Sequence, residues 1–199
     1  KDKEISDCKR LMKKIVIALF ASLIFFTAFA QNKPTVTWFG VDFTKAKMIG
    51  KKGFREPKTI QSYYLRKWNE EILRQDGKFN LKIYAKKGKV LTNLDVVNAQ
   101  NDKVDADQLV ISEKYSITEG DVQSVVSNYV GKGSGNGIVM VVESFNKKKK
   151  KAYIYPVLFD IASGNIIKMK KQKGKAGGMG FRNYWIGAIF HVMRKGIKK

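Results

Sequence analysis

Apolar residues recur along the chain with two periods, one typical of strands and one typical of helices. Thr35 to Phe43 is rich in β-branched and aromatic residues and predicts a strand, buried on both faces because its apolar character is nearly continuous. A Lys- and Gly-rich loop is expected over Thr44 to Glu56. Pro57 suits the first turn of a helix that runs to Gln75 and stops near Gly77. The expected apolar face of this helix comprises Ile60, Tyr63, Tyr64, Trp68, Ile72 and Leu73.

The middle of the chain predicts shorter elements. Phe79, Leu81 and Ile83 alternate with polar residues, which is typical of a short strand. Residues Asn93 to Ala99 fit one or two helical turns, and Leu109 to Ile111 fits a short buried strand.

A helix with a clear start signal follows. Thr118 to Asp121 resembles a capping box, and Gly131 is placed to end the helix. The spacing of apolar residues predicts a buried face of Val122, Val125, Val126, Tyr129 and Val130.

Three strands are then predicted close together, over Ile138 to Phe145, Tyr153 to Ile161 and Asn165 to Met169. Short turns connect them, so they must pair antiparallel. A final helix is expected over Gly180 to Arg194. Its buried stripe is expected to contain Trp185, Ala188, Ile189 and Val192.

Together these elements predict an α/β (α+β) fold. We expect a mixed β-sheet with a C-terminal antiparallel meander and three main helices packed on the sheet.

The segment from Met12 to Ala30 has the three parts of a bacterial export signal: a basic start, an apolar stretch of about 16 residues, and a small-x-small end. We expect cleavage after Ala30, which leaves residues 31–199 as a single α/β domain in the periplasm or outside the cell. The alternative is an uncleaved membrane anchor, but the apolar stretch is shorter than the roughly 20 residues that span a bilayer, which favours cleavage. No stable transmembrane span is expected after cleavage. Residues 1–30 are interpreted as an upstream fragment plus the signal peptide. Cys8 precedes the apolar stretch and is the only cysteine, so the domain is expected to contain no disulfide.

The chain is strongly basic, with a formal net charge of +22. Residues 1–30 hold six basic and three acidic residues, so residues 31–199 keep a charge of +19. Such a charge attracts polyanions. The expected partners are anionic envelope components (lipopolysaccharide, anionic lipid or acidic glycan) or another envelope protein, and nucleic acid is the least favoured partner. Lysine predominates over arginine, so the run Lys147 to Lys151 can also be read as a solvated hairpin tip.

One glycine-rich loop is a candidate anion site. Gly174 to Gly180 follows a strand and precedes a helix, so its backbone amides can converge on an anion. The alternative is that the glycines allow close packing of the strand against the helix. The loop Gly131 to Gly137 has the reverse order and is expected to be a flexible connector. The candidate anion-binding residues are Lys171, Lys173, Gly174, Lys175, Gly177, Gly178, Gly180 and Arg182.

No catalytic or metal motif stands out. His191 is the only histidine, which disfavours a zinc site, and there is no Gly-x-Ser-x-Gly nucleophile elbow. Asp42, Glu143 and Asp160 fall near strand ends, where active-site acids often gather, but Asp160 also suits a turn. Four aromatic residues that could stack on sugars or bases are expected to be core instead. They are Trp38, Trp68, Tyr184 and Trp185.

The sequence therefore favours a binding protein without catalytic residues, metal or cofactor. The alternatives are a hydrolase or transferase acting on phosphorylated or glycan substrates at the Gly174 to Gly180 loop, and an extracellular nucleic-acid binder.

Four segments carry a resemblance to known proteins: VTWFGVDF, YYLRKWNEEI, FDIASGNIIK and GGMGFRNYWIGAIF. Together they resemble a group of uncharacterised exported proteins from anaerobic Gram-negative bacteria. The order of elements is similar to that of the N-terminal α/β domain of the periplasmic protein TolB. This resemblance implies an envelope interaction domain and carries over no catalytic residue.

Overall fold

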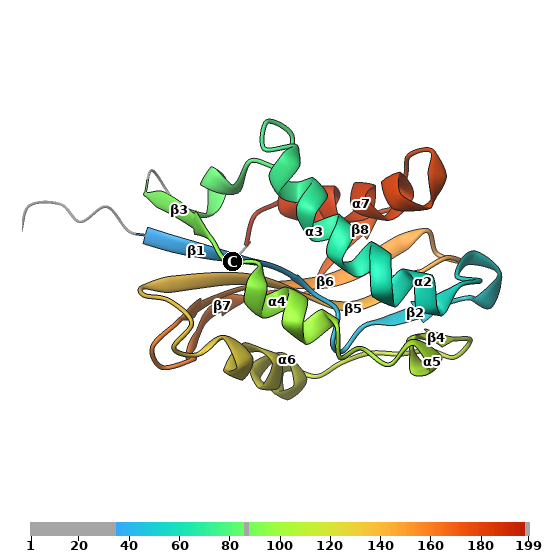
Figure 1. The fold of residues 1–199 in the computed structure, drawn as a ribbon, viewed down its shortest axis with the longest axis horizontal. Helices are drawn as coiled ribbons and strands as arrows, with labels where there is room; N and C mark the ends of the chain where they lie inside the picture. The colour runs from blue at the N-terminus through green and yellow to red at the C-terminus, as the bar shows by residue number, and fades with distance from the viewer. Residues whose placement is uncertain (1–34, 86–87, 198–199) are drawn as a thin grey trace, which may run out of the picture. The chain divides into compact units, whose positions relative to one another are not determined.

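The computed structural model describes residues 35–85 and 88–197. The predicted export signal, its cleavage site after Ala30 and the domain boundary lie outside these residues. The described residues form a mixed sheet with helices on both faces (Figure 1). The predicted α/β class is therefore confirmed.

Strand β5 (Asn136–Asn146) lies at the centre of the sheet. Strands β1 (Thr35–Asp42) and β2 (Lys47–Ile49) pair parallel to one edge of β5, one after the other. Strand β6 (Lys151–Asp160) pairs antiparallel along the opposite edge. The long apolar run of β5 is thus buried between neighbours on both sides.

The outer positions of the sheet are each filled by two short strands. On one side, β3 (Lys89–Thr92) pairs parallel to β1, and β4 (Val110–Ile111) pairs parallel to β2. On the other side, β7 (Ile166–Met169) and β8 (Gln172–Lys175) pair antiparallel to the two halves of β6. The predicted antiparallel meander is therefore only partly correct. After β7 the chain forms β8, a strand that the sequence pattern did not predict. Strand β8 pairs with β6 again, along its other half.

The first predicted helix forms in three parts: α2 (Pro57–Thr59), a π-helical segment over Ile60–Tyr64, and α3 (Leu65–Arg74). The wider π turn shifts the following residues around the helix axis. As a result Tyr63 is 50% exposed, and Leu65 is buried although the regular spacing did not predict it.

Two expectations for the first half of the chain are wrong. The expected loop from Thr44 to Glu56 contains β2 and a 3₁₀ turn over Lys51–Gly53, because two distant strands supply the pairing partners of β2. The strand expected around Phe79 to Ile83 is instead a 3₁₀ helix over Leu81–Tyr84. Asn80 caps this helix by accepting from the Lys82 backbone N–H, a local bond that competes with strand pairing.

The other predicted helices form close to their expected positions. They are α4 (Asp95–Asn101), α6 (Glu119–Val126) with its capping box, and α7 (Gly180–Met193). A short helix, α5 (Ala106–Leu109), precedes β4. Val130 is exposed, in contrast to its prediction, because the chain tightens into a 3₁₀ turn after α6.

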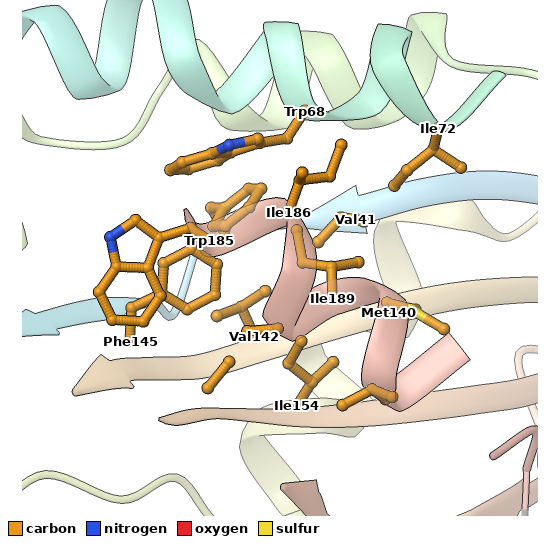
Figure 2. Close-up of a cluster of buried hydrophobic side chains, with 14 of the residues drawn as sticks. Val41, Trp68, Ile72, Met140, Val142, Phe145, Ile154, Trp185, Ile186 and Ile189 are labelled. Carbon is orange, nitrogen blue, oxygen red and sulfur yellow. The ribbon is translucent and has the colours of Figure 1, made fainter. Parts of the chain in front are cut away.

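Two apolar clusters pack on opposite faces of the sheet. The larger lies between the strands and helices α3 and α7, and Figure 2 shows how its side chains interlock. The rings of Phe145 and Trp185 stack with centroids 4.6 Å apart. The smaller cluster lies under α6 and α4. Trp38, Trp68 and Trp185 are all buried in the larger cluster, as predicted, whereas Tyr184 is only half-buried.

Candidate functional site

The turn between β5 and β6 carries consecutive exposed lysines at positions 147–150. Two hydrogen bonds hold its backbone. The Asn146 side-chain oxygen accepts from the Lys149 N–H at 2.8 Å, and the Lys147 N–H donates to the Ile49 carbonyl at 3.0 Å. The lysines therefore project from an ordered turn that is attached to the end of β2.

Strand β8 brings further lysines to this turn. Lys175 lies directly opposite Lys151 in the antiparallel pair of β8 and β6, and Lys173 lies opposite Tyr153. Just beyond β8, the Ala176 N–H donates to the Lys150 carbonyl at 3.0 Å. Like charges placed opposite each other destabilise a sheet, so this pairing costs some stability.

The loop after β2 lies on the other side of the turn. A Cβ atom placed on Gly53 would lie 2.5 Å from Cγ of Lys147, so this loop packs directly against the turn. The loop carries two more exposed lysines. We call the whole group the lysine-rich end, and its members are Lys51, Lys52, Lys147, Lys148, Lys149, Lys150, Lys151, Lys173 and Lys175.

The positive charge of the lysine-rich end is not balanced locally. Within residues 35–85 and 88–197, no ion pair joins any of its lysines to a carboxylate. Two of its ammonium groups lie over aromatic rings instead: Lys147 is 4.2 Å from the Tyr184 ring centroid, and Lys149 is 6.0 Å from that of Tyr153. A positive potential therefore extends from this end of the sheet.

Lys171 pairs with a carboxylate beside a β-bulge. Val142 pairs with Ile154 and Ser144 pairs with Tyr153, so Glu143 is an extra residue in β5. Oε2 of Glu143 accepts from Nζ of Lys171 at 2.5 Å and from the Ile117 N–H at 3.3 Å. Both side chains line a cavity of about 550 Å³.

The glycine-rich loop shows the close packing that the sequence left open as the alternative. A Cβ atom on Gly174 would overlap the Ala188 carbonyl in α7, and one on Gly187 would overlap the Gly177 carbonyl. The Gly177 N–H donates to the Tyr184 carbonyl at 3.0 Å. The glycines therefore allow β8 and the following loop to pack closely against α7. At least the Gly177 amide already donates a hydrogen bond within the protein.

Arg182 lies at a second cavity, of about 600 Å³, which Gly177 and Gly178 also line. Arg74 and Lys78 border this cavity too, so it is basic. Glu71 is buried behind this cavity and forms ion pairs with both arginines. Its Oε2 lies 2.6 Å from Nη2 of Arg74, and its Oε1 lies 3.3 Å from Nη1 of Arg182. The hydrogen bond from Arg74 is the main reason that the pKa of Glu71 is lowered.

The predicted anion-site residues therefore separate into four places. Lys173 and Lys175 belong to the lysine-rich end, and Gly174 packs against α7, the helix that begins at Gly180. Lys171 faces Glu143, while Arg182 borders the second cavity with Gly177 and Gly178. An anion-binding role for them stays a prediction.

Sequence reasoning did not assign Lys51, Lys52, Arg74 or Lys78 to any site. The lysine run at 147–151 is visible in the sequence as a concentration of charge, but no sequence pattern links Lys51, Lys52, Arg74 or Lys78 to a site.

The three candidate acids each have their own partners. Asp42 is buried, and its carboxylate accepts from the Tyr129 hydroxyl at 2.6 Å and from the Thr44 N–H at 2.8 Å. Burial raises the pKa of Asp42 in spite of these bonds. Asp160 accepts from the Ser163 N–H and hydroxyl, as expected for a turn residue. Among the residues that the structure describes, Asp42, Glu143 and Asp160 share no side-chain partner, so their hydrogen bonds do not indicate a common site.

In the described ranges 35–85 and 88–197, no group of three or more His, Cys, Asp or Glu side chains is arranged to hold a metal ion. No helix in the same ranges combines the length and the apolar character needed to cross a bilayer. His191 is half-buried on α7, with its ring centroid 6.1 Å from that of Phe190.

The chain matches no protein-family model, and no curated protein matches its sequence. Several solved structures are similar to it, including the three that follow. The C-terminal domain of LpoB from Salmonella enterica has 13% identity and a TM-score of 0.33, covering 77% of this chain and 91% of that one. The lipoprotein GNA1162 from Neisseria meningitidis has 9% identity and a TM-score of 0.32, covering 83% and 99%.

The hypothetical protein CT253 from Chlamydia trachomatis has 10% identity and a TM-score of 0.36, covering 83% of this chain and 91% of that one. At such TM-scores these likenesses assign neither a fold family nor an activity to this chain. The three structures are not TolB domains, so the resemblance to TolB stays a prediction.

Proposed function

We propose that this protein is an exported, non-enzymatic binding domain of the cell envelope that holds anionic envelope components at its lysine-rich end. The observation that supports this most directly is the gathering of exposed lysines from three separate segments, none of which forms an ion pair with a carboxylate of residues 35–85 and 88–197. Export to the envelope rests on the signal-like segment from Met12 to Ala30.

The energetics fit an electrostatic mode of binding. A lysine close to an anionic membrane surface contributes about 1 kcal/mol, so a few lysines acting together are enough for reversible attachment. Repulsion between Lys151 and Lys175 is relieved when an anion lies between or above them. The attraction of exposed charges is screened beyond about 10 Å at 0.1 M salt, so binding should depend strongly on ionic strength.

The test is co-sedimentation of the full chain with vesicles of phosphatidylcholine alone or mixed with phosphatidylglycerol, and with lipopolysaccharide. We expect retention on the anionic samples at low salt and release as salt rises. The triple variant Lys148→Gln, Lys149→Gln, Lys150→Gln should bind weakly. A matched control, Lys82→Gln, Lys103→Gln, Lys132→Gln, removes the same charge from exposed positions outside the lysine-rich end.

Equal weakening in the two triple variants would show that only net charge matters and would contradict the proposed site. Retention that does not change with salt would contradict the electrostatic mode. The enzymatic alternative at the Gly174 to Gly180 loop gains no support, since the Gly177 amide is bonded within the protein and Asp42 is buried against Tyr129 and Thr44.

A further inference from the structure

The cavity beside the Glu143 bulge has a lining that combines three kinds of chemistry. It lies between the β5–β6 hairpin and the segment at 112–116 that follows β4, and its volume is about 550 Å³. Two glutamates, several lysines and aromatic rings meet there, and one of the glutamates, Glu113, is exposed. The lining residues that matter are Tyr115, Glu143, Lys148, Lys149, Tyr153 and Lys171.

Glu143 is the first of these features. Its side chain is 3% exposed, and both of its hydrogen bonds go to Oε2, from Lys171 and from the Ile117 N–H. Within the described residues, no donor reaches Oε1. Because Glu143 lines the cavity, Oε1 can accept a further hydrogen bond there. A ligand that brings an O–H or N–H group into the cavity can donate to this oxygen.

The lysines are the second feature. Lys171 is paired with Glu143, but Lys148 and Lys149 have no carboxylate partner within the described residues. The cavity therefore also favours a negative group at its lysine-lined side. A simple anion such as inorganic phosphate supplies the negative group for the lysines but no good donor for Glu143, because its oxygens are poor donors when ionised. Glu143 also repels it.

Tyr115 is the third feature. Its hydroxyl donates to the Lys45 carbonyl at 2.8 Å, which holds the half-buried ring in place. Within the described part of the chain this ring stacks on no other aromatic ring. Tyr153 differs, because Lys149 and Lys171 already lie near its ring, at 6.0 and 5.4 Å from the centroid. Tyr115 thus offers the cavity an apolar wall.

We propose that this cavity binds an acidic sugar unit of an envelope glycan. A sugar carrying a carboxylate or a phosphate has the three matching groups. Its acid lies against Lys148 and Lys149, a hydroxyl donates to Oε1 of Glu143, and the C–H face of its ring lies on Tyr115. This inference rests on the proposed function, since Lys148 and Lys149 belong to the lysine-rich end, and it names the ligand class of one part of that end.

The test is calorimetric titration of the full chain with four probes: trigalacturonate, glucose 6-phosphate, maltotriose and inorganic phosphate. We expect at least one of the two acidic sugars to bind and the neutral sugar and inorganic phosphate not to bind at the same concentration. Binding by trigalacturonate alone identifies a carboxylate ligand, and binding by glucose 6-phosphate alone identifies a phosphate ligand. Binding of inorganic phosphate as tight as that of the acidic sugars would overturn the proposal, and so would the absence of binding by either acidic sugar.

Variants of Tyr115 give a second readout. Tyr115→Leu should weaken acidic-sugar binding by up to about tenfold, the loss expected for one aromatic contact. Tyr115→Phe keeps the ring and should retain most of the binding. Unfolding curves of both variants show whether the fold is intact. Equal binding by the leucine variant and the parent protein would contradict the role of the ring.

The two proposals fail in different ways. Tyr115→Leu should leave retention on anionic vesicles unchanged, because the lysines remain. The double variant Lys51→Gln, Lys52→Gln should weaken vesicle retention but not sugar binding, because neither lysine lines the cavity. Loss of sugar binding with intact vesicle retention overturns only the glycan proposal. Absence of salt-sensitive vesicle retention overturns the proposed function, whatever the sugar titration shows.

Discussion

Asn69 and Asn101 donate to the same backbone oxygen, the carbonyl of Val41, each at 3.0 Å. Their own side-chain oxygens accept from the backbone as well, Asn69 from the Val41 N–H at 2.7 Å and Asn101 from the Phe43 N–H at 2.8 Å. Asn69 lies on α3 and Asn101 on α4, the helices that pack with different apolar clusters.

These amides replace a strand. Strand β3 pairs with β1 over Thr35–Trp38, so in the described part of the chain no strand pairs with the outer edge of β1 at Val41. Buried backbone groups must find partners, and the two asparagines supply them. Strand β1 has a bulge between Trp38 and Gly40 and lies close to α3 there, since a Cβ atom on Gly40 would lie 2.6 Å from Oδ1 of Asn69.

We predict that Asn69→Ala and Asn101→Ala each lower the free energy of unfolding by about 1–3 kcal/mol, because each leaves buried backbone groups without partners. Urea unfolding measures this effect. The double variant should lose less than the sum of the single losses, because the two side chains share the Val41 carbonyl. Asn165→Ala, at an exposed position, is the control and should change little. Losses as small as in this control would contradict the role assigned to the two amides.

The buried Asp42 predicts a pH effect on stability. In the unfolded chain this group titrates near its ordinary pKa of 3.8, and burial raises its pKa in the fold. Between the two values the folded state holds a proton that the unfolded state releases. The contribution of Asp42 to the free energy of unfolding therefore falls as pH rises from the pKa of Asp42 in the unfolded chain through its higher pKa in the folded protein.

Asp42→Asn removes this titration and keeps an oxygen that can accept from Thr44. Relative to the parent protein, the variant should thus become more stable as pH rises from 4 to 8. Urea unfolding at both values measures the change. A stability difference between variant and parent that is the same at the two pH values would contradict the raised pKa.

Two helical glycines give a matched pair for testing how β8 seats on α7. Alanine ordinarily favours a helix over glycine by up to about 1 kcal/mol. Gly187→Ala should instead destabilise the protein by about 1–3 kcal/mol, because its Cβ overlaps the Gly177 carbonyl and forces the loop away. Gly120→Ala in α6 should be neutral or stabilising, since its Cβ would meet only Oγ1 of Thr118, at 3.6 Å. Thermal unfolding compares the two, and equal effects would argue against the close packing.

The facing lysines of β6 and β8 predict opposite effects on stability and on binding. Lys175→Glu places a carboxylate opposite Lys151 and should raise the free energy of unfolding by roughly 0.2–1 kcal/mol. The same change should weaken retention on anionic vesicles. Lys132→Glu, at an exposed position away from the lysine-rich end, makes the same change in charge and should do neither. Stronger vesicle binding by Lys175→Glu would contradict the placement of the site.

Elements with local signals were predictable from sequence. Helix α6 begins at the capping box formed by Thr118 and Asp121, because both partners lie within one turn. Pro57 likewise marks the start of α2. Strands β2 and β8 were missed because each is short and is stabilised by a distant partner, β5 or β6, which no local pattern reveals.

The candidate site shows the same division. The run at 147–151 and the basic balance are visible in the sequence, since charge is a property of composition. The packing of Gly53 against Lys147, which adds Lys51 and Lys52, joins residues more than ninety positions apart and has no local signature. The bulge that buries Glu143 beside Lys171 depends on the register between two strands.

The periodic segments, the charge and the signal-like segment before Gln31 can be read from the sequence, because they depend on neighbouring residues or on composition. Which lysines share one end of the sheet, which acid is buried and which amides close the edge of β1 depend on how the chain packs. Those outcomes require residues far apart in the chain to meet, and the free energy of their contacts exists only once the sheet and helices have packed.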